Sequence, residues 1–420
     1  MLNDPVVIVS AARTPMGAFQ GELKACSAPQ LGATAIAAAL KRAGISPTAA
    51  APETGTAAGA TAPTQVGEVL MGCVLPAGLG QAPARQAALG AGLPDSTTCS
   101  TINKMCGSGM KAVMLAHDQL VYAGLVGAGS ETPSMMLAGG MESMSNAPYL
   151  LPRVRAGLRM GHGQVLDHMF LDGLEDAYEP GRLMGSFAED CADRYGFSRA
   201  EQDAFALRSL ERALQASRDG HFDWEIAPVT LPAKRGAQAQ CISRDESPFS
   251  ASAEKIPLLK PAFRADGTVT AANASSISDG AAALLLMRRS SAEQLGMTPL
   301  ALIVGHASHA QAPAWFSTAP VGAMQRLFRQ TGWHADSVDL YEINEAFAVV
   351  TLAAMKELQL PAEKVNIHGG ACALGHPIGA SGARILVSLI GALRRSGGRR
   401  GVASLCIGGG EATAMAIELA

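Results

Sequence analysis

The chain has 420 residues, which is long for one hydrophobic core and predicts two or three domains. Hydrophobic residues make up 48% of it and charged residues 16%, which is typical of a globular interior and excludes a disordered chain. The net charge of −3 argues against a nucleic-acid-binding surface, although a local basic patch for a phosphorylated ligand stays open.

The eight cysteines contain no Cys-x-x-Cys pair and no zinc-finger spacing, so we expect neither a disulfide framework nor a metal site. Residues 6–9 open an apolar strand with no basic region or cleavage site before it. Apolar runs such as residues 281–287 are far shorter than a membrane span. We therefore expect a cytoplasmic protein with reduced thiols and with no membrane or nucleic-acid partner.

The first part of the chain alternates strands and helices. Residues 6–10 predict a buried strand, and residues 31–42 predict an alanine-rich helix. Residues 46–64 are rich in Ala, Pro, Thr and Gly, which indicates a surface insertion. A strand at 66–74 and a helix at 82–89 follow.

Cys106 lies at a predicted strand-to-helix turn. Residues 97–102 predict a short buried strand, Gly107 and Gly109 break the pattern, and an apolar helix follows from Met110. The free N–H groups and the dipole of a helix N-terminus predict a lowered pKa for this thiol. The alternative is a buried, inert cysteine before a glycine-rich turn.

The middle of the chain differs in amino-acid composition from the segments on either side. Residues 121–133 read as a small-residue insertion, and a strand at 136–143 ends in a glycine turn. Residues 144–277 carry more charge and more proline, with a helix at 199–217, and predict an inserted loop domain. The strand at 281–287 returns to the α/β framework.

A second series of predicted strands and helices, similar to the first, begins near residue 302. Residues 375–384 open a helix much as residues 107–111 do, and residues 405–411 resemble residues 137–142. This similarity predicts two copies of one α/β unit, with the turns of both copies meeting at their interface.

Motifs near the C-terminus carry a family resemblance. Gly-His-Pro within residues 365–387 is followed by Cys-x-Gly-Gly-Gly within residues 402–411, and Asn344-Glu345-Ala346-Phe347 precedes both. Together with Cys106, this constellation resembles the thiolases, the acyl-CoA acetyltransferases, over nearly the whole chain. The resemblance implies an α/β chain with a duplicated five-layer αβαβα fold and an inserted loop domain.

The corresponding domain boundaries are predicted as follows. Residues 1–135 and 278–290 form an N-terminal half that carries the nucleophile, and residues 291–420 form a C-terminal half that carries the histidine and the second cysteine. Residues 136–277 form the loop domain, which the resemblance links to coenzyme A binding and to tetramer contacts.

The resemblance assigns a role to each catalytic candidate. Acyl transfer needs a nucleophilic thiolate, a base and donors for an oxyanion. Cys106 would be the nucleophile, His376 its activator, and Cys406 the base that removes a proton beside the thioester carbonyl. The N–H groups of Cys106 and Gly408 would form one oxyanion hole, and His376 with a water held by Asn344 would form the other.

Each candidate also has a simpler interpretation. A histidine before proline is commonly a turn residue, and Cys406 could be a buried strand cysteine, although the three glycines after it weaken a strand. Asn344 is a good helix N-cap, and both interpretations of it can hold together. His368 and Cys372 could be mistaken for a metal pair, but two ligands without another motif argue against zinc.

The resemblance extends to the ligand side. Ser275 lies in a stretch that resembles the one contacting the pantetheine arm of coenzyme A, and Met184 matches a methionine of the acyl pocket in short-chain members. Leu183 stands where many acetoacetyl-specific relatives have histidine, which leaves the chain-length preference open. Pro248 stands where relatives often have arginine beside the adenine, so nucleotide contacts need not transfer.

The implied activity is the reversible condensation of two acetyl-CoA into acetoacetyl-CoA and CoA, or thiolysis of a short 3-ketoacyl-CoA. CoA thioesters are the substrates, and no cofactor is expected. One alternative is a broader-chain 3-ketoacyl-CoA thiolase of fatty-acid β-oxidation. The others are a ketoacyl synthase, which should lack Cys406 as a base, and a silent lipid carrier or scaffold, which should lack one of Cys106, His376 and Cys406.

The resemblance also implies a tight dimer that pairs into a homotetramer through the loop domain. Residues 121–150 are small, apolar and methionine-rich. They fit a self-association surface, or a core around the turn at Gly139 and Gly140, since a buried strand has the same composition.

Overall fold

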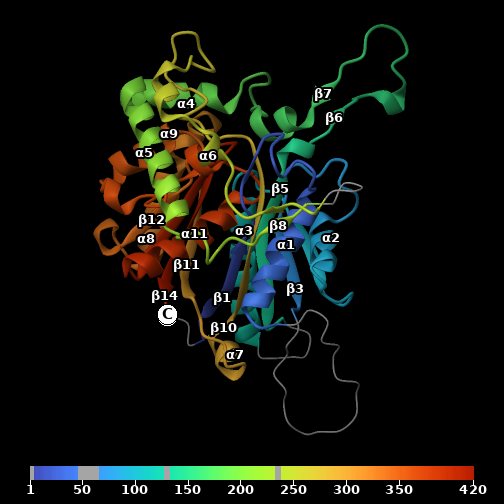
Figure 1. Cartoon of the computed structure of the whole chain (residues 1–420), viewed down its shortest axis with the longest axis vertical. Coiled ribbons are helices and arrows are strands. Elements are labelled where there is room, and N and C mark those ends of the chain that lie inside the picture. Colours follow the sequence, from blue (N-terminus) through green and yellow to red (C-terminus); the bar gives the residue numbers. More distant parts are fainter. Residues whose placement is uncertain (1–3, 46–65, 127–132, 232–237) are drawn as a thin grey trace.

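The computed structural model describes residues 4–45, 66–126, 133–231 and 238–420 (Figure 1). The insertion predicted at 46–64 lies outside the described residues. Within the described ranges, no helix is long and apolar enough to cross a membrane.

A ten-stranded sheet forms the framework. Its order is β4-β3-β5-β10-β1-β11-β14-β13-β12, and the short β2 pairs with β10. The strands are β1 (Val6–Arg13), β2 (Gly17–Ala18), β3 (Glu68–Gly72), β4 (Thr98–Ile102), β5 (Met135–Ser143), β10 (Ser278–Arg288), β11 (Ala301–Ala310), β12 (Leu340–Ile343), β13 (Arg400–Ile407) and β14 (Glu411–Leu419). β1 and β11 are adjacent, so strands far apart in the sequence close the centre of the sheet.

The sheet contains the same arrangement twice. In the first half, β1, β10 and β5 are antiparallel neighbours, and β3 and β4 continue the sheet in parallel with β5. In the second half, β11, β14 and β13 are antiparallel neighbours, β12 is parallel to β13, and a parallel bridge from Tyr341 to Val365 stands in the place of β4. The halves meet where β1 pairs antiparallel with β11, through Val7↔Leu302 and Ile8↔Ala301. The predicted duplication is confirmed.

Three hydrophobic clusters arrange the helices into layers. The framework helices are α1 (Ala28–Arg42), α2 (Pro83–Gly90), α3 (Ser108–Val126), α7 (Arg289–Gln294), α8 (Ala319–Thr331), α9 (Ala348–Leu358), α10 (Ala371–Leu374) and α11 (Ser381–Ser396). α1 and α2 pack on the outer face of the first half, and α8 and α9 pack on that of the second half. α3 and α11 share one cluster with strands of both halves. The order helix, sheet, helix, sheet, helix confirms the five-layer fold.

The central helical layer approaches the sheet closely at glycines. A Cβ atom on Gly140 in β5 would lie 2.0 Å from the Gly379 carbonyl oxygen, and one on Gly109 in α3 would lie 2.8 Å from the Ala383 nitrogen in α11. Real Cβ atoms do not approach other atoms so closely. These glycines are therefore required for the contact between the two halves.

The segment between β5 and β10 is an insertion that covers one end of the molecule and also reaches the first half, where Val229 and Ile242 join the hydrophobic cluster of α1 (Figure 1). It contains β6 (Tyr149–Leu150), β7 (Leu166–Asp167), α4 (Met184–Tyr195), α5 (Arg199–Arg218), β8 (Val229–Thr230), β9 (Cys241–Ile242) and α6 (Ser247–Ser250). β6 and β7 form the base of an arm, residues 149–167, that extends away from the body (Figure 1). The predicted boundary at residue 136 is wrong, because β5 pairs with β10 along its length and belongs to the sheet.

A buried arginine joins the insertion to the framework. Arg13 at the end of β1 makes a two-pronged ion pair with Asp245, at 2.7 Å and 2.9 Å, and also pairs with Glu225. All three side chains are buried. Planar guanidinium geometry suits such a pair, and losing one partner would leave a buried charge uncompensated.

Two local predictions differ from the structure. The strand expected to be buried before Cys106 is β4, whose residues are exposed or half-buried because it lies at the edge of the sheet. Residues 121–126 belong to α3 and not to an insertion, and residues 127–132 lie outside the described residues.

Candidate active site

A tight turn between β4 and α3 presents Cys106. Met105 has a φ of 49°, a left-handed conformation that is uncommon for a residue with a side chain. The Ser108 hydroxyl donates to the Met105 carbonyl at 2.6 Å and accepts the Lys104 N–H at 2.8 Å. These bonds hold the strained turn, and strain of this kind is concentrated at functional sites.

A cavity of about 380 Å³ lies in front of this turn. It is lined by Cys106, Phe170, Gly173, Leu174, Leu183, Met184, Gly185, Ala262, Phe263, Thr270, Ala271, Ala274, Ser275, Ser276, Ile277, Phe316, Ala346, Phe347, His376, Ile378, Cys406 and Gly408. The first half, the insertion and the second half all contribute to it. Every catalytic and substrate-binding candidate named from the sequence, except Asn344, lines this cavity.

His376 is held in one tautomer. Its Nδ1 lies 2.6 Å from the Ser381 hydroxyl, which donates its own hydrogen to the Pro377 carbonyl at 3.0 Å. The hydroxyl therefore accepts from Nδ1–H, which leaves Nε2 without a proton. Nε2 is buried and has no hydrogen-bond partner among the described residues. Burial, with Arg384 nearby, lowers the pKa of His376 to about 3, so the ring is neutral and Nε2 is free to accept a proton.

The Cys106 thiol is protonated at neutral pH. Burial raises its pKa to about 11, although the N–H groups of Gly408 and Cys106 hydrogen-bond to it and oppose that shift. The lowered pKa expected from the sequence is therefore wrong, because the loss of solvation outweighs the helix terminus. The geometry calls for a neighbouring base rather than a preformed thiolate.

Cys406 is a second protonated thiol beside the first. It lies near the end of β13 and is fully buried. Burial, together with the proximity of the other titratable thiol, Cys106, raises its pKa well above the ordinary value. A neutral thiol at this position can donate a proton and then act as a base.

Asn344 lies behind the cavity wall. It follows β12, and its carbonyl accepts the N–H of Ala346, which does line the cavity. Its side-chain oxygen and nitrogen are buried without a hydrogen-bond partner among the described residues. The N-cap interpretation is wrong, since α9 begins at Ala348 with Phe347 as its N-cap. A bound water could form hydrogen bonds with these two buried atoms.

Glu142 is a site residue that the sequence did not single out. Its buried carboxylate accepts the N–H groups of Val74 at 2.9 Å, Leu75 at 3.1 Å and Gly379 at 2.9 Å. Burial raises its pKa to about 7 against these hydrogen bonds. The carboxylate thus joins the loop after β3 to the loop that carries His376. The signal in the sequence that could have identified it is a glutamate that follows two glycines near the end of an apolar strand.

The ligand-side candidates Ser275 and Met184 line the same cavity. Ser275 donates its N–H to the Ala346 carbonyl at 2.9 Å, and Met184 begins α4 with Leu183 as its N-cap. Most of the lining is apolar. Pro248 is buried in α6 and is not part of this lining.

His368 and Cys372 have separate partners. His368 Nε2 lies 3.0 Å from His221 Nδ1, and the Cys372 sulfur lies 3.7 Å from the Glu345 carbonyl oxygen. Among the described residues, neither belongs to a group that could hold a metal ion.

Sequence comparison identifies the family. The model described as "Thiolase, N-terminal domain" matches residues 6–290, and the one described as "Thiolase, C-terminal domain" matches residues 297–419. The chain belongs to the thiolase family.

Its relatives match along nearly their full lengths. Acetyl-CoA acetyltransferase 2 of Arabidopsis thaliana is 48% identical, with 99% of this chain and 97% of that protein covered. An acetyl-CoA acetyltransferase of Chromobacterium violaceum is 46% identical, with 98% and 99% covered. A thiolase from Ascaris suum, solved in complex with coenzyme A, has a TM-score of 0.87 and 39% identity, with 99% and 100% covered.

Proposed function

We propose that this chain is an acetyl-CoA C-acetyltransferase that condenses two acetyl-CoA molecules into acetoacetyl-CoA and CoA, and that also runs the reverse thiolysis. The observation that carries the proposal is that Cys106, His376 and Cys406 line one cavity. The names of the full-length relatives support the substrate class.

The first half-reaction forms an acyl-enzyme. Nε2 of His376 takes the Cys106 proton, and the sulfur attacks the carbonyl carbon of acetyl-CoA. The N–H groups of Cys106 and Gly408 stabilise the oxyanion. The bond from the carbonyl carbon to the CoA sulfur then breaks, and Cys406 gives its proton to the leaving thiolate. The products are acetyl-Cys106, protonated His376, the Cys406 thiolate and free CoA.

The second half-reaction forms the carbon–carbon bond. The Cys406 thiolate takes a proton from the methyl carbon of a second acetyl-CoA, and the enolate oxygen is stabilised by His376 and a water held by Asn344. The carbanion attacks acetyl-Cys106, the sulfur leaves, and protonated His376 returns its proton to it. Both thiols and the imidazole are then neutral again.

Substitution of the two cysteines separates these steps. Cys106→Ser should lose both directions, because a hydroxyl is a far weaker nucleophile near neutral pH. Cys406→Ala should still acquire an acetyl group on Cys106, while condensation falls about 10²–10⁴-fold, the usual contribution of a positioned base. Rapid-quench assays with radiolabelled acetyl-CoA and peptide mapping measure both. Equal losses of acylation and condensation, or label on another cysteine, would contradict the assignment.

Activity assays test the three alternatives: a silent carrier, a ketoacyl synthase and a broader-chain 3-ketoacyl-CoA thiolase. Acetoacetyl-CoA plus CoA should yield acetyl-CoA, which neither a silent carrier nor a ketoacyl synthase would produce. Rates across 3-ketoacyl-CoA chain lengths should fall beyond short chains, because Leu183, Met184 and Phe316 enclose a cavity of about 380 Å³. Ser275 and Met184 are the residues proposed to contact the substrate.

The same proposal includes the setting of the enzyme. We expect a cytoplasmic homotetramer, a dimer of dimers, that serves fatty-acid metabolism without a cofactor. Two exposed features support assembly: β4 leaves one edge of the sheet open, and the arm carries exposed apolar side chains, including Tyr149, Leu151 and Met160.

A further inference from the structure

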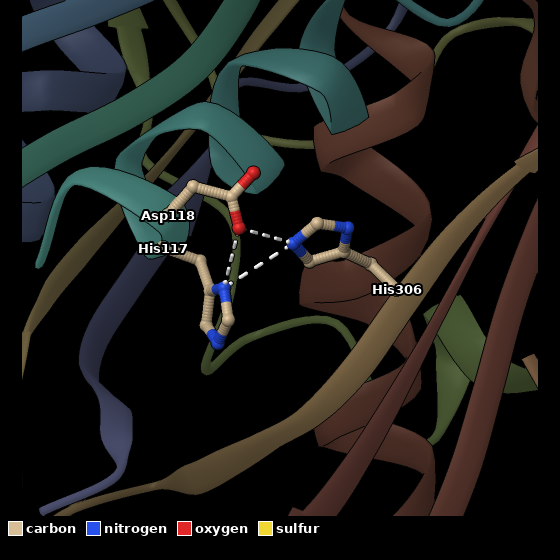
Figure 2. A group of neighbouring side chains, drawn as sticks. All are labelled: His117, Asp118 and His306. Atoms are coloured by element: carbon tan, nitrogen blue, oxygen red, sulfur yellow. Dashed lines mark hydrogen bonds and ion pairs between the residues drawn. The ribbon is translucent and has the colours of Figure 1, made fainter. Parts of the chain in front are cut away.

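Two histidines and an aspartate lie close together at the interface between the two halves, away from the cavity. His117 and Asp118 lie on α3, and His306 reaches toward them from β11 (Figure 2). His306 Nε2 lies 2.8 Å from Asp118 Oδ1 and 3.2 Å from His117 Nδ1. His117 Nδ1 lies 3.1 Å from the same Asp118 oxygen.

The cluster is separate from the catalytic centre. Cys106 precedes the first turn of α3, whereas His117 lies nine residues beyond Ser108, the first residue of that helix. At a rise of about 1.5 Å per residue, the cluster is about 14 Å along the helix from the catalytic turn. Neither histidine nor the aspartate lines the substrate cavity.

No placement of protons satisfies all three contacts. Each ring nitrogen is either a donor or an acceptor, and an ionised carboxylate oxygen only accepts. If both nitrogens carried hydrogen, both could donate to Asp118 Oδ1, but the 3.2 Å contact between the two nitrogens would not be a hydrogen bond. If either nitrogen lacked hydrogen, its lone pair would face that of Asp118 Oδ1, at 2.8 Å or 3.1 Å. A single cation between the three atoms would satisfy every lone pair.

The distances match those of a coordination sphere. In a six-coordinate site, neighbouring ligand atoms about 2.1 Å from the ion stand at right angles and are about 3.0 Å apart, closer than the roughly 3.4 Å of a tetrahedral zinc site. The observed separations of 2.8, 3.1 and 3.2 Å form such a triangle, with one open side for water. Two imidazoles with one carboxylate select divalent first-row transition ions over calcium or magnesium.

The surroundings hold the ligands while leaving access. The His117 and His306 side chains are only 12% and 15% exposed, and Asp118 is 53% exposed. The two rings meet edge to face with centroids 4.9 Å apart, which fixes their orientation.

We propose that His117 Nδ1, Asp118 Oδ1 and His306 Nε2 bind one six-coordinate first-row divalent ion, such as Co²⁺ or Zn²⁺, with water completing its coordination. Because His306 is far from His117 and Asp118 in sequence and meets them only in the folded chain, the ion ties α3 of the first half to β11 of the second and stabilises the fold. It takes no part in acyl transfer.

Calorimetric titration of Zn²⁺ into the full-length, tag-free and metal-stripped protein tests the site. Cys106 is first blocked with iodoacetamide so that its thiol does not bind the ion. One ion per chain is expected. Co²⁺ should give the absorption of nitrogen and oxygen ligation, without sulfur charge-transfer bands. Sulfur bands, or no binding, would overturn the proposal.

Variants distinguish a metal site from a hydrogen-bonded contact. His306→Ala and Asp118→Asn should each weaken binding by at least about 10²-fold, since even a supporting residue contributes about 10–100-fold. His309→Ala is the matched control on the same strand, where the ring bonds Gln311, and it should bind like the parent chain. Zn²⁺ should raise the thermal midpoint of the parent and of His309→Ala only. An equal Zn²⁺-dependent rise in all four proteins would show that the cluster is a structural contact.

Discussion

At the scale of single residues, the proposed catalytic centre is a set of groups that are neutral at rest. Burial raises the pKa of Cys106 to about 11 and lowers that of His376 to about 3. The enzyme therefore does not store a thiolate and an imidazolium. Proton transfer from Cys106 to Nε2 has to accompany attack, when the oxyanion donors first gain a charge to stabilise.

This arrangement predicts how alkylation depends on pH. Because the thiol pKa lies above the tested range, iodoacetamide modification of Cys106 should rise about tenfold per unit between pH 7 and pH 9 as the thiolate fraction grows. Mass spectrometry of the Cys106 peptide measures the rate, with the exposed Cys241 as a reference outside the cavity. A rate that levels off by pH 8 would show a thiolate that is already formed.

Glu142 gives a prediction about stability. Glu142→Gln should lower the free energy of unfolding by about 1–3 kcal/mol, because an amide NH₂ would oppose at least one of the three N–H donors that the carboxylate satisfies. Thermal unfolding measures the loss, with Glu254→Gln as an exposed control. An unchanged midpoint would mean that the carboxylate is not needed to join its two loops.

At the scale of elements, the contact between β5 and the loop before α11 has the least room for an added side-chain atom. Gly140→Ala places a methyl group 2.0 Å from the Gly379 oxygen, so the folded chain should be lost or its midpoint should fall sharply. Gly124→Ala makes the same change on the exposed face of α3, where the new methyl group would lie 3.3 Å from Cδ of the Arg288 side chain and needs only a small movement of it, so the variant should be close to neutral. Circular dichroism melts compare the two variants. Equal melts would contradict the packing argument.

Local sequence patterns predicted most helices and strands, but they did not predict how exposed a strand is or where the insertion begins. The strands at 6–10 and 281–287 and the helix at 31–42 were predicted because alternation, apolar runs and alanine content are local signals. The exposure of β4 was missed, since the same β-branched residues suit an edge strand and a central one. The boundary at 136 was placed too early, since charge and proline content change only after β5 ends.

The candidate site was predictable where it follows motifs. Cys106, His376, Cys406, Gly408, Ser275 and Met184 were named from short motifs, and the structure brings them to one cavity. Their protonation states depend on burial, which a sequence does not display. The metal cluster was missed for a related reason: Asp118 and His306 are separated by 188 residues, so no spacing motif connects them.

At the scale of the whole molecule, the arm should control assembly. Leu150 and Leu166 are paired across its base, so residues 151–165 can be replaced by Asn-Gly, a two-residue hairpin turn. Light scattering should give the intact chain a tetramer mass and the shortened chain a dimer mass. A monomer mass near 43.1 kDa for the intact chain would contradict both forms of the assembly proposal.

The repeated topology of the sheet has a consequence for the origin of the reaction. The turn that carries Cys106 opens α3, and the loop that carries His376 leads into α11, the matching helix of the second half. An ancestor made of two identical, unfused units would have carried the same loop before both helices, so each unit would have presented the same side chains to the site. Joining the units in one gene allowed the two loops to diverge, so that one now supplies Cys106 two residues before α3 and the other supplies His376 five residues before α11.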